Sequence, residues 1–227
     1  MKPWAHGLSV VCLSALAGVT GPILFLLIMT VTGLVQPAYD PIQETISMLV
    51  FGPYGWLQTL VFFLFGFFLI VFIFRLYLAI DRRVSSRIGI ASLIVIGLGF
   101  FLIGVFPTQR PGTELTLYAL IHRYTTGAIS LLFTVACFAF ALGFRTDPLW
   151  KRFSLYTFIT GAIALTFIIL LASTPLDWSW TGFYERMLLL SGLLWITVVA
   201  VRLLISCLRE WRKSRRSLGN VSSNLPR

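Results

Sequence analysis

The basic residues of this chain are distributed unevenly between six long apolar runs. These runs extend approximately over residues 8–35, 56–78, 88–106, 117–143, 153–172 and 184–208. A helix needs about 20 apolar residues to cross the hydrocarbon of a bilayer, because it rises about 1.5 Å per residue and must satisfy its own backbone hydrogen bonds there. The sequence therefore predicts an all-α membrane protein, a bundle of six transmembrane helices.

The positions of Lys and Arg also predict an orientation. Of the 18 basic residues, 15 lie at alternate ends of the apolar runs, whereas Arg110, Arg123 and Arg186 lie at the opposite ends. Loops rich in Lys and Arg stay in the cytoplasm, so we expect both termini to be cytoplasmic, in a plasma or inner membrane. The net charge of +10 then reflects topology and does not indicate nucleic-acid binding.

We expect one transmembrane domain over residues 1–208 and a basic cytoplasmic tail over residues 209–227. The tail is suited to anionic lipid headgroups, at about 1 kcal/mol for each basic residue close to the surface. A signal peptide ending near Ala15-Leu16-Ala17 is an alternative for the amino terminus, but the apolar run continues to Val35, which favours an intact first helix. The three cysteines, Cys12, Cys137 and Cys207, lie in apolar runs without a close pair, and we interpret them as small buried hydrophobic residues.

The first outer loop contains signals for a short helix. Asp40 stands where an N-cap is expected, Pro41 takes the first helical position, and Gln43 is placed to complete a capping box. Polar residues fall on one face of this segment and apolar residues on the other. The spacing predicts a short amphipathic helix over residues 41–50, lying on or dipping into the outer membrane surface.

Three strings of residues resemble a known family. They are the ten residues from Ser47 to Trp56 (SMLVFGPYGW), the five from Gly104 to Thr108 (GVFPT), and His122 near the start of the fourth run. Together they resemble the six-helix membrane proteins called domain of unknown function 998 (DUF998), over about residues 15–208. The resemblance implies the same fold and topology but no reaction, and where the family commonly has an Asp after the Pro-Thr pair this chain has Gln109.

Ionisable residues at a membrane boundary are costly to bury, so they are the first candidates for function. Such residues gather at the predicted outer ends of the helices. The candidate ligand-binding residues are His122, Arg123, Glu185, Arg186, Glu44, Asp40 and Tyr54. We expect them to form a polar outer pocket for a small or lipidic ligand or a partner, with Trp56, Trp178, Trp180 and Tyr184 at its rim. In a structural interpretation, Asp40 is only a cap, and Arg123 and Arg186 either extend to the lipid headgroups or pair with Glu44 and Glu185.

Motifs for common chemistry are missing from the sequence. It contains no HExxH, GxSxG, GxxxxGK or CxxC, and its two histidines fall at opposite predicted ends of the bundle. We therefore predict no catalytic residue, metal or cofactor. Two alternatives to ligand binding stay open: a membrane-embedded hydrolase or transferase that uses His122 with Glu185 or Glu44, and a scaffold or assembly factor.

Overall fold

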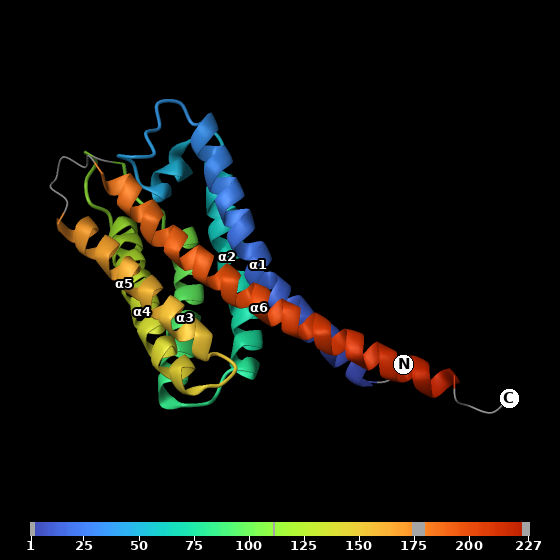
Figure 1. Ribbon diagram of the computed structural model, residues 1–227. Coiled ribbons are helices and arrows are strands. Elements are labelled where there is room, and N and C mark those ends of the chain that lie inside the picture. Colours follow the sequence, from blue (N-terminus) through green and yellow to red (C-terminus); the bar gives the residue numbers. More distant parts are fainter. Residues whose placement is uncertain (1–2, 111, 174–179, 224–227) are drawn as a thin grey trace.

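Six apolar helices dominate the computed structural model, which describes residues 3–110, 112–173 and 180–223 (Figure 1). They are α1 (Pro3–Val35), α2 (Gly55–Ala79), α3 (Val84–Val105), α4 (Leu117–Thr146), α5 (Lys151–Ser173) and α6 (Thr181–Ser223). A short 3₁₀ helix, η1 (Ile46–Phe51), lies between α1 and α2, and no strand occurs in the part of the chain described. All six α-helices are long and apolar enough to span a membrane, which confirms the predicted six-helix fold.

Helices that follow each other in the sequence pack side by side, and α6 returns to pack against α1. The start of α1 and the end of α6 lie at one end of the molecule, with the α2–α3 and α4–α5 connections (Figure 1). The opposite end carries η1 and the α3–α4 connection, and we call it the η1 end. This arrangement brings segments far apart in the sequence together there.

Two helices are longer than the sequence predicts. Helix α1 begins at Pro3, before the expected start near residue 8, and α6 continues to Ser223 through most of the segment interpreted as a tail. The extension of α6 contains four Arg, one Lys and one Glu, which favour helix, and its first glycine is Gly219. The division at residue 208 and the tail's contact with lipid headgroups stay predictions.

Aromatic side chains fill much of the interior. Phe25 of α1 packs edge-on against Phe65 of α2 and Phe100 of α3, at ring distances of 5.3 and 6.1 Å. Close approach of α1 to its neighbours depends on Gly18, because a Cβ there would overlap the Phe72 ring and crowd Ala200. On the outside many apolar side chains are exposed, as contact with lipid tails requires.

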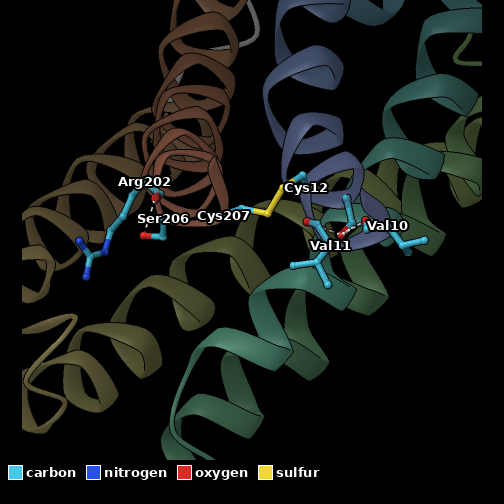
Figure 2. The surroundings of a disulfide bond; sticks show 7 residues. Val10, Val11, Cys12, Arg202, Ser206 and Cys207 are labelled. Carbon is cyan, nitrogen blue, oxygen red and sulfur yellow. Dashed lines mark hydrogen bonds between the residues drawn. A yellow bond between two sulfur atoms is a disulfide. The ribbon is translucent and has the colours of Figure 1, made fainter. Parts of the chain in front are cut away.

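The cysteine interpretation was wrong for two of the three residues. Cys12 of α1 and Cys207 of α6 form a disulfide, with their Cα atoms 5.7 Å apart (Figure 2). Pairing across 195 residues depends on which helices lie side by side and in what register, and the local sequence contains neither. Cys137 is a free, buried cysteine, as expected.

The first loop differs from the predicted amphipathic helix. Asp40 does accept hydrogen bonds from the Ile42 N–H at 2.8 Å and from the Gln43 amide at 2.9 Å, the interactions expected of a cap. However, they close a turn, and helical structure begins only at Ile46, as the 3₁₀ helix η1. Ile46 and Leu49 of η1 are buried in the hydrophobic core, so η1 packs into the bundle.

Candidate ligand-binding site

His122 is the centre of a hydrogen-bonded group at the η1 end. The first turns of α4 bring its ring inward, and the residue is 4% exposed. Its Nδ1 lies 2.7 Å from the carbonyl oxygen of Phe106, the residue that follows α3. Its Nε2 lies 2.9 Å from Ser47 Oγ of η1. One imidazole therefore joins three segments of the chain.

These partners determine the direction of the hydrogen bonds when the imidazole is neutral. A carbonyl oxygen only accepts, so Nδ1 of His122 carries the hydrogen and donates it to Phe106. The other ring nitrogen, Nε2, then has a free lone pair. Ser47 donates its hydroxyl hydrogen to that lone pair, and its oxygen keeps its own lone pairs free.

A cavity of about 100 Å³ lies beside this group, between η1 and all the membrane-spanning helices except α5. Thirteen of its eighteen lining residues are Phe, Ile or Leu, and Gly192 adds a small apolar surface. Its polar lining residues are Ser47, Glu185, Thr126 and Ser130. Ser47 and Glu185 belong to the η1 end, whereas the lining residues Phe133 and Ile196 lie two or three helical turns further into the bundle.

Glu185 connects the last helix to η1. Its Oε2 accepts a hydrogen bond of 2.6 Å from the Ile46 N–H, one residue before Ser47. The residue is only partly exposed, and part of its surface faces the cavity. The Glu185 carboxylate thus accepts the hydrogen bond of an N–H group at the start of η1, for which η1 itself has no acceptor.

Arg186, the next residue, holds the turn before η1 against α6. Its guanidinium donates to the carbonyl oxygens of Pro41, Glu44 and Gly182 at 2.6, 2.9 and 2.9 Å. It also donates to the hydroxyl of Tyr39 and lies over that ring. The ion pairs proposed for Arg186 in the structural interpretation are therefore replaced by bonds to backbone carbonyls and a phenol.

Tyr39 also takes part in holding this turn, and the pKa of its phenol is perturbed. We call Arg186 and Tyr39 together the clamp. Its hydroxyl donates to the Thr45 carbonyl at 3.0 Å. Burial raises the pKa of Tyr39 to about 12, even though the charge of Arg186 beside it acts in the opposite direction. The phenol therefore stays protonated and remains a donor throughout the physiological pH range.

Glu44 lies outside the cavity. It lines a second hollow of about 440 Å³ together with residues of the α1–α2 and α3–α4 connections, among them Met48 and Arg110. Partial burial raises the pKa of the Glu44 carboxyl, the charge of Asp40 raises it further, and Arg186 lowers it. The structure thus divides the predicted cluster into two places.

The other predicted site residues lie away from the cavity. Arg123 follows His122 on α4 but is exposed, and Tyr54 is 49% exposed. Of the predicted rim, Trp180 stacks on Tyr184 beside the start of α6, and Trp56 is exposed. Trp178 lies outside the described residues. Within those residues no group of three or more His, Cys, Asp or Glu side chains is close enough to hold a metal ion.

Sequence reasoning missed Ser47 as a site residue. Ser47 lies within the predicted amphipathic helix but was not among the candidate site residues, although the string that resembles the family begins there. The three strings carrying that resemblance contribute Ser47, Phe106 and His122, which the structure joins by hydrogen bonds. Their joint presence in the resemblance was the available signal.

Six spanning helices and an apolar cavity at one end define a multi-pass helical membrane protein with an internal pocket. The model of the family described as protein of unknown function (DUF998) matches residues 19–202, so the chain belongs to this family. The resemblance noted in the sequence is thereby confirmed. Comparison with curated proteins and with solved structures found no match.

Proposed function

We propose that this protein binds a lipidic ligand at its η1 end. The apolar part of the ligand occupies the cavity, and its polar group lies beside Ser47 and Glu185. The observation that supports this most directly is the lining of the cavity, which combines thirteen Phe, Ile and Leu residues with a carboxylate and a hydroxyl near one end. Pockets of mainly apolar character with a few polar groups are typical of ligand sites.

The volume of the cavity limits which part of a lipid can enter it. A dry apolar cavity of roughly 150 Å³ is large enough to bind benzene. A cavity of about 100 Å³ therefore takes a short hydrocarbon segment, such as the end of a chain or a methyl-branched unit. The rest of the lipid stays in the bilayer, whose tails already surround the bundle.

We further propose that the η1 end faces the outer side of a plasma or inner membrane and that both termini are cytoplasmic. The excess of Lys and Arg at the opposite end supports this orientation. Epitope tags at either terminus are then detected by antibody only in permeabilised cells or inverted vesicles. A tag at the exposed Glu114 is detected in intact cells or spheroplasts.

A matched pair of glycine variants tests the binding site. Gly192 lines the cavity, and a Cβ there makes only ordinary contact with the Phe133 ring, 3.6 Å away. Leu at position 192 therefore fills the cavity. Gly127 of α4 is the control, because it is exposed and a Cβ there meets nothing within 4 Å.

Binding of a fluorescent fatty acid to the purified protein in nanodiscs is measured for both variants. We expect Gly192→Leu to weaken binding at least tenfold and Gly127→Leu to leave it unchanged. Equal binding by wild type and Gly192→Leu, or no saturable binding by the wild type, contradicts the proposal. The scaffold alternative then becomes the better explanation.

A further inference from the structure

The hydroxyl of Ser47 is bonded differently from most other hydroxyls in this bundle. Ser14, Thr32, Thr126 and Ser130 each donate to a carbonyl one turn earlier in their own helix, at 2.7 to 3.0 Å. This satisfies a hydroxyl within a membrane at little cost. Ser47 instead points its hydroxyl at an imidazole nitrogen 75 residues away in the sequence, and it does so on the wall of a cavity.

From this geometry we propose that Ser47 is the nucleophile, and His122 the general base, of an acyl-transfer centre that acts on carboxylic esters of lipids. The proposal rests on the ligand site described above and adds a reaction to it. A serine is a weak nucleophile until an adjacent base accepts its proton in the transition state. Ser47 and His122 have the required contact, because Oγ and Nε2 lie 2.9 Å apart.

The orientation of the base is fixed by a third group. An effective base needs one ring nitrogen free and the ring held in place, and a hydrogen bond from the other nitrogen provides both. The Phe106 carbonyl accepts that bond from Nδ1 at 2.7 Å. Because this carbonyl oxygen also stabilises a positively charged ring, His122 is suited to holding the proton during the reaction.

The lining of the cavity makes an ester of a lipid the fitting substrate class. Its apolar depth, lined by Phe133 and Leu193, receives hydrocarbon, so an ester carbonyl attached to that hydrocarbon lies near Ser47. In addition, Glu185 is a positioning residue, since its bond to the Ile46 N–H fixes the backbone next to Ser47. The proposed reaction needs no metal ion.

The reaction follows from these contacts. Ser47 Oγ attacks the carbonyl carbon while its proton moves to His122 Nε2, and the carbonyl oxygen takes the electron pair. The carbon–oxygen bond to the leaving alcohol then breaks, and that alcohol receives the proton from Nε2. The acyl group remains on Ser47 as an ester. A water molecule, activated by the neutral His122 in the same way, releases it as a carboxylic acid and restores the serine.

An alkyl fluorophosphonate tests the nucleophile, because it forms a stable covalent bond with an activated serine. The full-length protein in nanodiscs is treated with the probe, and the modified residue is mapped by peptide mass spectrometry. We expect modification of Ser47, absent in Ser47→Ala. In His122→Ala the modification rate falls about 10²- to 10⁴-fold, the contribution typical of a general base. Ser14→Ala, which removes a hydroxyl outside the cavity, reacts like the wild type.

The outcomes separate this proposal from the ligand site. Saturable fatty-acid binding without modification of Ser47 overturns the nucleophile and leaves the ligand site intact. If neither fatty-acid binding nor modification of Ser47 is observed, the ligand site and the nucleophile are both overturned. Modification mapped to another residue, or an unchanged rate in His122→Ala, also overturns the proposal. Because the mapping is made on the wild-type protein, the result stands even where Ser47→Ala fails to fold.

Discussion

The carboxylate of Glu185 and the backbone N–H of Ile46 form a hydrogen bond of 2.6 Å between residues 139 positions apart. It joins the second turn of α6 to the first residue of η1, next to Ser47. The N–H groups in the first turn of a helix have no acceptor within that helix, so the Ile46 N–H needs one from another element. The bond therefore links the last helix of the bundle to the candidate site.

Replacing Glu185 by Ala should destabilise the protein. The variant leaves the Ile46 N–H without its acceptor, and hydrogen bonds to charged groups contribute about 1.5–3 kcal/mol. We expect the free energy of unfolding to fall by about that amount, and by less in Glu185→Gln, whose amide oxygen still accepts. Unfolding in detergent, followed by tryptophan fluorescence, measures the change. Glu114→Gln, at an exposed position, is the control, and an equally stable Glu185→Ala contradicts the prediction.

Gly182 should not tolerate a side chain. The Gly182 N–H donates to the Gln43 carbonyl at 3.2 Å, and a Cβ at position 182 would overlap the Glu44 carbonyl oxygen. Gly182→Ala should therefore push the Pro41–Thr45 turn away from α6 and speed hydrogen exchange at the amides of that turn. Gly127→Ala adds the same methyl group in open space and should leave exchange unchanged. Equal exchange in the two variants would show that the turn is not held by this contact.

High pH should weaken the clamp at Tyr39. The pKa of this phenol is about 12 in the folded protein against an ordinary 10.0, so the folded state binds its proton more tightly than the unfolded state. The resulting stabilisation is complete below pH 10 and is lost as the pH rises from 10 to 12. In Tyr39→Phe the loss of stability over that interval should be smaller. In addition, the phenolate absorbance of the folded wild type minus that of the variant should rise near pH 12, and a rise near pH 10 would contradict the burial.

The disulfide between Cys12 and Cys207 should protect two of the three cysteines from alkylation. Cells are treated with an alkylating reagent before lysis, because the predicted orientation places this pair near the cytoplasm, where thiols are kept reduced. After denaturation without reductant, we expect alkylation of Cys137 alone. Reduction should expose the other two, and Cys137→Ser should retain the bridge. Alkylation of all three cysteines without reductant would show that the bridge is absent in the cell.

Local patterns predicted the spanning helices because each one is decided by its own residues. A run such as 56–78 crosses the bilayer whatever its neighbours are, and the helix observed there, α2, covers Gly55–Ala79. The turn at Asp40 was also partly predictable, since its hydrogen bonds to Ile42 and Gln43 span at most three residues. The predicted continuation of this turn into an α-helix is not observed. Instead, Arg186 of α6 binds carbonyl oxygens of the turn.

The site depended on contacts that local patterns do not contain. The sequence placed His122, Glu185 and Glu44 at one boundary, but it could not show that Glu185 faces a cavity while Glu44 lines a different hollow. Ser47 gained its importance only from a residue 75 positions away. Which side of each helix turns inward depends on packing, and the spanning helices have apolar residues on every side.

The circular order of the helices has a consequence for how the protein is made. A nascent chain enters the membrane from its amino terminus, so η1 and α4 are both present before α6 is synthesised. Ser47 can meet His122 at that stage, whereas Glu185 and the wall formed by Leu188 and Leu193 arrive with the final helix. The cavity therefore closes only when α6 is inserted, and a ribosome stalled before α6 would leave the apolar lining of the cavity open to the bilayer.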